Sequence, residues 1–220
     1  MTTTLNSSAL ISLTSETAFP AAKFGYTARL IASIPNASII DWILVELRTE
    51  TAANTKIAAQ AGFLKSDGTI VDLDGTSPLS MSVSAGSYYV VARHRNHLAI
   101  MSAAPVALSG TSTLYNFTTA QAQAFGANPM NDLGGGVFGM VAGDANGDGV
   151  VKYNLSNNDR LLIYNRIGNS GFNVTVNGYY SEDLNLDGIV KYNLTNNDRL
   201  LIYNVIGNGG FNVTKTTQVP

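Results

Sequence analysis

The sequence predicts a mainly β protein: an antiparallel β-sandwich followed by a small domain of two similar loop–helix units. Residues 1–125 contain seven or eight short β-like stretches, separated by turn residues at intervals of about 8–12 residues, which is typical of an Ig-like sandwich. Residues 143–220 contain an internal repeat. Residues 126–142 include Gly134, Gly135 and Gly136 and are predicted to be a linker between the two domains.

The clearest strand candidates show alternating apolar and polar residues. Residues 39–50 alternate around Trp42, which we expect to be buried, and residues 57–64 and 69–73 flank a hairpin turn at Lys65-Ser66-Asp67-Gly68. Further strands are expected at 26–33, 79–83, 87–95, 98–102 and 112–118. Residues 1–20 have a β-like centre at 9–14. This segment is either the first strand of its own sandwich or an arm that joins a neighbouring subunit.

The second part of the chain repeats one motif with an offset of 39 residues, from Asp144 to Asp183 (183 − 144). Direct comparison of 144–175 with 183–214 gives 26 identical residues in 32 positions. Each copy begins with the pattern Asp-x-Asn-x-Asp-Gly and continues to Asn-Asn-Asp-Arg-Leu-Leu-Ile-Tyr-Asn. A repeat of this length indicates one supersecondary unit written twice, with the two copies packed together.

Each copy has the pattern of the first half of a calcium-binding loop. Oxygen-bearing side chains occupy loop positions one, three and five, and glycine occupies position six, where it allows the chain to curl around an ion. The carbonyl of the seventh residue is a further expected ligand. The alternative is a pair of solvated Asp-Gly turns. The predicted ligands are Asp144, Asn146, Asp148 and Val150 in the first loop, and Asp183, Asn185, Asp187 and Ile189 in the second.

The later loop positions differ from the standard pattern. Position twelve, where a bidentate carboxylate is expected, is Leu155 or Leu194, and position nine is a lysine. The next carboxylates, Asp159 and Asp198, begin a predicted two-turn helix that a glycine follows, so they can face back into the loop and complete the ion's shell. They are predicted as the late ligands of two Ca²⁺ ions. The neighbouring amides are weaker candidates: Asn157, Asn158, Asn196 and Asn197.

With these residues, the tail resembles the dockerin type I duplicated calcium-binding repeat, in the form found at the C-terminus of large secreted bacterial surface proteins. The match is at Asp144, Asn146, Asp148 and their second-copy equivalents. The resemblance covers residues 143–214 and implies two calcium sites and a cohesin-type protein partner. Residues 84–97 resemble the late strands of Ig-like or prealbumin-like domains of surface proteins, at the level of fold only.

Composition limits the classes of function. Charged residues make up only 13% of the chain and the net charge is −2, which does not favour nucleic acid or an anionic membrane as partner. The chain has no cysteine, and no run approaches the 18 apolar residues of a membrane span. The first residues lack a basic stretch followed by an apolar core, so a mature form or a fragment is expected.

No catalytic motif stands out. His94 and His97 are expected in an exposed polar patch, because a spacing of three does not put two side chains on one strand face. Asp72 and Asp74 are expected in a turn beside Gly75. We therefore expect a non-enzymatic, extracellular, calcium-binding structural protein, a subunit of a surface fibril or adhesin that associates with itself. The alternatives are a dockerin-like docking module for a cohesin-type partner, or a carbohydrate-binding region of a secreted glycan-degrading enzyme.

Overall fold

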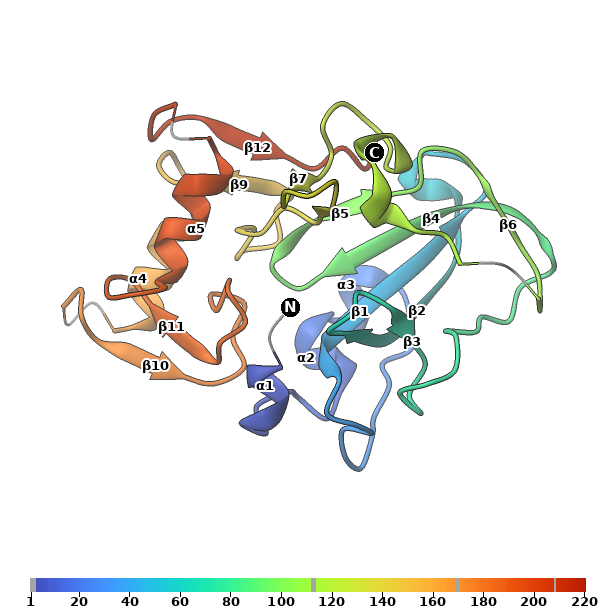
Figure 1. Cartoon of the computed structure of the whole chain (residues 1–220), viewed down its shortest axis with the longest axis horizontal. Coiled ribbons are helices and arrows are strands. Elements are labelled where there is room, and N and C mark those ends of the chain that lie inside the picture. The colour runs from blue at the N-terminus through green and yellow to red at the C-terminus, as the bar shows by residue number, and fades with distance from the viewer. Residues whose placement is uncertain (1–2, 112–113, 169–170, 208) are drawn as a thin grey trace.

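The computed structural model describes residues 3–111, 114–168, 171–207 and 209–220. It shows a mainly β protein with antiparallel sheets and short helices. A six-stranded sheet lies at one end of the molecule, and the repeat, orange to red in Figure 1, lies at the other. No helix in the described part of the chain is long and apolar enough to cross a bilayer.

The large sheet is built around one central strand, β1 (Ile39–Arg48). Along the sheet the order is β3–β2–β1–β4–β5, and β6 pairs with β4; these strands are β2 (Lys56–Lys65), β3 (Ile70–Val71), β4 (Gly86–His94), β5 (His97–Met101) and β6 (Val106–Leu108). Every residue of β1 is buried because both faces of the sheet are covered. The predictions of a strand at 39–50, of the hairpin after it, and of strands at 87–95 and 98–102 are confirmed, within a residue or two at their ends.

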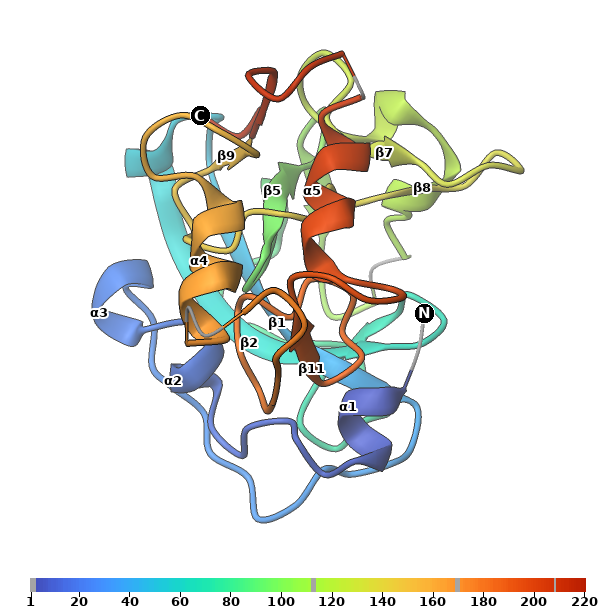
Figure 2. The same cartoon turned by 90° about the vertical axis from the view of Figure 1, so that its left-hand side faces the viewer.

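One face of the sheet is covered by the N-terminal segment. It forms three single-turn helices, α1 (Thr4–Ser7), α2 (Ser15–Ala18) and α3 (Ala21–Phe24), seen in blue in Figures 1 and 2. Leu5 and Phe19 are each only 1% exposed and pack in one core with Trp42 and Phe63. The Trp42 ring lies 4.3 Å from that of Phe63, and its Nε1 donates a hydrogen bond to the carbonyl of Ser12 at 2.7 Å. The predicted burial of Trp42 is confirmed.

Several predicted strands are wrong. Residues 9–14 and 26–33 form no strand; only an isolated bridge joins Thr14 to Leu30, and the chain otherwise turns through the short helices. Residues 79–83 are irregular. The predicted strand at 112–118 starts on residues outside the described set, and its remainder contains a 3₁₀ turn, Phe117–Thr119. Residues 9–14 and 26–33 alternate as strands do, but they meet the sheet through side chains and not through main-chain pairing with it.

The opposite face of the sheet is covered by connecting segments. A 3₁₀ turn, Gln121–Gln123, and a small hairpin of β7 (Asn131–Asp132) and β8 (Phe138–Gly139) belong to these segments, whereas the 3₁₀ turn Ala53–Thr55 connects β1 to β2. Met130 is 1% exposed and packs against Ala92 and Ile100 of the sheet. The other sheets in the described residues have two strands each, so the predicted sandwich arrangement is not confirmed. The predicted linker, 126–142, contains this hairpin and buried residues.

The repeat forms two units that complete each other. The first contributes β9 (Val150–Lys152), α4 (Asp159–Arg166) and β10 (Thr175–Asn177); the second contributes β11 (Ile189–Lys191), α5 (Asp198–Val205) and β12 (Thr214–Thr216). β9 pairs with β12 and β10 pairs with β11, so each unit's loop strand is held by the other unit's last strand. Both predicted helices are confirmed.

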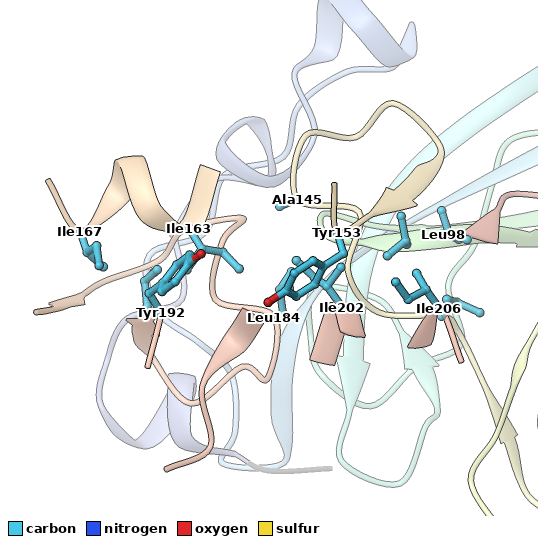
Figure 3. Close-up of a cluster of buried hydrophobic side chains, with 12 residues drawn as sticks. Leu98, Ala145, Tyr153, Ile163, Ile167, Leu184, Tyr192, Ile202 and Ile206 are labelled. Atoms are coloured by element: carbon cyan, nitrogen blue, oxygen red, sulfur yellow. The ribbon is translucent and has the colours of Figure 1, made fainter. Parts of the chain in front are cut away.

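The two helices bury the same face against a shared core. Ile163 and Ile202 are both 0% exposed, and they pack in one cluster with Tyr153 and Tyr192 (Figure 3). Leu98 of the large sheet belongs to the same cluster. Equivalent residues of the two copies therefore pack into the same core, and the large sheet covers one side of it.

Candidate metal centre

The two repeated loops have the same hydrogen-bonded shape. In the first loop, the Asp144 carboxylate accepts hydrogen bonds from the backbone N–H of Asp148 at 3.0 Å and of Gly149 at 3.1 Å. In the second, Asp183 accepts them from Asp187 and Gly188 at 3.1 and 3.0 Å. Gly149 has a φ of +82°, in the left-handed region that glycine adopts at little cost, so the curl predicted at position six is present.

Positions three and five tighten the same curl. Asn146 Oδ1 accepts a hydrogen bond from the backbone N–H of Asp148 at 2.8 Å, and Asp148 Oδ1 accepts one from that of Val150 at 2.9 Å. The second loop repeats these contacts through Asn185 and Asp187, at 2.8 and 3.0 Å. Asx residues commonly make such bonds to the backbone two residues on. Identical local bonding explains why both copies of the pattern produce the same loop.

The late carboxylates return to their loops as predicted. Asp159 is the first residue of α4, and its carboxylate accepts hydrogen bonds from the backbone N–H of Ala145 at 2.9 Å and of Lys152 at 2.8 Å. Asp198 begins α5 and accepts those of Leu184 at 2.7 Å and Lys191 at 2.8 Å. Both side chains are buried. Each carboxylate therefore ties the start of its helix to both ends of its loop, and each lies fifteen residues after the loop's first aspartate (159 − 144 and 198 − 183).

The neighbouring asparagines have other roles. Asn158 and Asn197 cap the helices: their Oδ1 atoms accept the backbone N–H of Leu161 and Leu200, at 2.9 and 3.0 Å. Asn157 and Asn196 accept, through their carbonyls, the side-chain N–H of the position-three asparagines. These contacts give each of the four asparagines a structural role, so their presence in both copies does not require them to be metal ligands.

Burial makes the ionised carboxylates costly. It raises the pKa of Asp159 and of Asp198 to about 7 and that of Asp183 to about 6, and the charge of the neighbouring loop aspartate adds to the first two shifts. Burial also raises the pKa of Asp144. The folded loops therefore hold negative charge that the surrounding protein does not fully compensate.

Each loop has an excess of formal negative charge. Each loop brings three aspartates and one lysine: Lys152 lies 2.7 Å from Asp148, and Lys191 contacts Asp187 in the same way. The balance is −2 per loop (−3 + 1). The second loop has an additional neighbour, Arg95, whose Nη2 lies 4.0 Å from Asp183 Oδ2. The two loops are thus alike in shape and unequal in charge.

The predicted metal ligands fit a hard cation. A carboxylate has about four acceptor sites, and Asp144 uses two of them for backbone N–H groups. All predicted donors are oxygens, as Ca²⁺ prefers, and Val150 and Ile189 begin β9 and β11 directly after the loops. The described residues contain no group of three His, Cys, Asp or Glu side chains already gathered as a metal site.

A buried polar network joins the second loop to the sheet. Asp41 of β1 accepts hydrogen bonds from Arg95 Nε at 2.9 Å and from the hydroxyl of Tyr179. Burial alone would raise the pKa of Asp41, but Arg95 and His94 outweigh it and hold that pKa well below its ordinary value. Asn96 donates to the carbonyls of Ser181 and Asp183, at 3.0 and 2.7 Å. The β4–β5 turn therefore anchors the repeat to the sheet.

The prediction of an exposed histidine patch is wrong. His94 is buried, and its Nδ1 lies 3.0 Å from Nδ1 of His97. The two residues are register partners across a tight turn, Arg95-Asn96, so a spacing of three brings them together on adjacent strands. The short Arg95-Asn96 turn between the two strands is the feature of the sequence that could have predicted this proximity. Asp72 and Asp74 do lie at a turn: Asp74 accepts the backbone N–H of Thr76 and Ser77.

Comparison with known proteins found no matching family model, no similar curated protein and no similar solved structure.

Proposed function

We propose that this chain is a secreted, non-enzymatic structural protein whose two repeated loops each bind one Ca²⁺ ion, and that it serves as a subunit of a surface fibril or adhesin. The observation that carries the proposal is the pair of identically curled loops, each with only oxygen ligands and a formal charge of −2 from its own aspartates and lysine, with Arg95 beside the second loop. One Ca²⁺ per loop would offset that charge. Asp144, Asn146, Asp148, the carbonyl of Val150, and Asp159 would hold the first ion.

Calcium would stiffen a region that now depends on costly buried carboxylates. Asp159 and Asp198 lie where each helix begins, so an ion held by them would link loop, helix and paired strands. Binding to the native state adds to its stability. In a chain without disulfides, this is a physical route to a durable extracellular module.

Self-association is supported by the edge of the large sheet. β3 pairs only with Phe63 and Leu64 of β2, so the earlier part of β2 is an edge in the described sheet. Ile57 in that part is 48% exposed. An open edge can pair with a strand of another subunit, and the low content of charged residues reduces repulsion between copies.

A dockerin-like docking role is the second candidate. The sequence-equivalent residues Leu161 and Leu200 are 47% and 45% exposed on α4 and α5, whereas Ile163 and Ile202 face the core. The helices therefore present a matching pair of apolar positions to solvent. A cohesin-type partner would bury them, and Leu161→Ala or Leu200→Ala would then weaken that complex without changing the ion count.

Calcium counting tests the leading proposal. Equilibrium dialysis of the full chain should give two Ca²⁺ per molecule, and Asp148→Ala or Asp187→Ala should each remove about one. Asp67→Ala, in the exposed β2–β3 turn, is the matched control and should leave two. Fewer than two ions bound by the parent protein would contradict the proposal. Negative-stain microscopy with calcium and with a chelator tests the fibril separately, and a chain that stays monomeric at high concentration with calcium would exclude it.

A further inference from the structure

A cleft of about 440 Å³ lies where three distant parts of the chain meet. The α2–α3 segment forms one wall, the β4–β5 hairpin forms the floor, and the first repeated loop and Tyr179–Ser181 form the other wall. Its volume is within the range of small-ligand sites, which is about 300–1,000 Å³. Its wall includes Asp144 and Asn146 of the first predicted calcium loop, but the loop's other predicted ligands, Asp148, Val150 and Asp159, do not line it.

The charged side chains that line the cleft are mainly cationic. Lys23, Arg93, Arg95 and Arg166 contribute to its lining, and Asp144 is the one carboxylate that does so. The arginines' partners, Glu46, Asp41 and Glu182, do not line the cleft; their side chains are 4%, 0% and 8% exposed. The carboxylates therefore lie behind the arginines, and the cleft presents the positive side of each pair.

Lys23 has the least compensated charge. Its side chain is exposed, and among the described residues it makes no ion pair; its Nζ donates to the carbonyl of Gly147 at 3.0 Å. An ammonium group has three donors, so this contact leaves it able to bind an anion. Because the low-dielectric walls of a cleft focus the field, a positive lining attracts an anion more strongly there than on an open surface.

Aromatic rings hold the cations in place. Lys23 Nζ lies 5.3 Å from the centre of the Phe24 ring, and Arg166 lies 4.3 Å from that of Tyr180. Arg95 lies 4.4 Å from that of Tyr179. Cation–π contacts and buried carboxylate partners reduce the freedom of these side chains before any ligand binds. A site ordered in advance loses less entropy on binding.

We propose that this cleft binds a small organic anion with a carboxylate, of the size of a uronic acid unit, with Lys23 and Arg166 as the contacts to the carboxylate. Arg166 donates from Nε and Nη2 to Glu182, which leaves the Nη1 side of its guanidinium for a ligand carboxylate, and the ammonium of Lys23 supplies a second charge. The same chemistry could come from a free sugar acid or from a unit of an acidic polysaccharide. The cleft does not depend on calcium, although an ion beside Asp144 would strengthen anion binding.

The test uses the full chain and D-glucuronic acid, with D-glucose as the neutral counterpart of the same size. Binding is followed by NMR shifts of backbone amides and by isothermal titration. Glucuronate should bind saturably, with shifts at residues 23–24 and 146–147. Glucose should bind at least about tenfold more weakly, because it lacks the charged group that accepts hydrogen bonds from the two cations. Oligomers of a uronic acid would bind more tightly than the monomer only if the natural source is a polysaccharide.

Two variants of one residue separate charge from folding. Lys23→Gln should weaken glucuronate binding about tenfold and Lys23→Arg should preserve most of it, whereas Lys65→Gln, at the β2–β3 turn, should have no effect. Equal binding of glucose, absence of saturation, or a Lys23→Gln chain that binds normally would each overturn the proposal. Repeating the glucuronate titration with calcium and with a chelator distinguishes this proposal from the calcium proposal. If the loops bind no calcium, glucuronate binding should be the same in both buffers, but Lys23→Gln should still weaken it.

Discussion

The buried late aspartates predict how stability depends on pH and calcium. In the metal-free chain, burial raises the pKa of Asp159 and of Asp198 to about 7, against an ordinary value of 3.8. Between these values the folded chain holds protons that the unfolded chain has already lost. Unfolding therefore releases protons, and the free energy of unfolding falls as the pH rises from about 4 to about 7 and is level above that range.

The size of the effect follows from the same numbers. At about 1.4 kcal/mol per pH unit, the difference between 3.8 and about 7 corresponds to about 4 kcal/mol for each carboxyl. This is a large part of the 5–15 kcal/mol by which domains are typically stable. Calcium should reverse the trend, because the ion requires ionised ligands and binds them better at high pH.

Guanidinium unfolding, followed by the fluorescence of the single tryptophan, measures this directly. In chelator the free energy of unfolding should be several kcal/mol lower at pH 8 than at pH 5, and millimolar calcium should remove the deficit. Asp159→Asn should lose less than half of the pH dependence, because Asp198, Asp183 and Asp144 also have raised pKa values, whereas Glu50→Gln, an exposed control, should keep all of it. A metal-free chain equally stable, or more stable, at pH 8 would refute the reasoning.

Three further outcomes are expected. Trp42→Ala should lower the free energy of unfolding by about 3–5 kcal/mol, because its ring is fully buried against Phe63, while Ile57→Ala at the sheet edge should cost well under 1 kcal/mol in the same denaturation assay. Asp41→Asn should destabilise the chain by about 3–5 kcal/mol, since it leaves buried Arg95 without its charge partner; a loss below 1 kcal/mol would contradict the anchoring role of this network. Deletion of residues 1–14 should abolish the folded monomer in circular dichroism and NMR spectra, because Leu5 and Ile11 belong to the core, whereas a folded monomer that no longer assembles would support an intersubunit arm instead.

The sequence alone determined the features that depend on short-range bonding. The two loops are shaped by contacts between residues two to five apart, such as Asp144 with Gly149, and the helices begin at an asparagine cap three residues from its partner. Because these bonds lie within one stretch of chain, a repeated stretch forms them twice. The turn at Lys65–Gly68 and the presence of the central strand are predictable for the same reason, because turn chemistry and apolar pattern are local, but the burial of both faces of β1 does not follow from its alternating pattern.

Tertiary structure decided what joins distant residues. An apolar alternation shows that residues 9–14 and 26–33 have a face to bury, but not whether the main chain will pair, and here their side chains cover a sheet as irregular chain. The meeting of His94 with Asp41, the anchoring of the repeat by Arg95 and Asn96, and the cleft beside Lys23 each bring together side chains separated by dozens of residues. These contacts depend on how the large sheet and the repeat pack together, and the spacing of residues within one segment does not predict them.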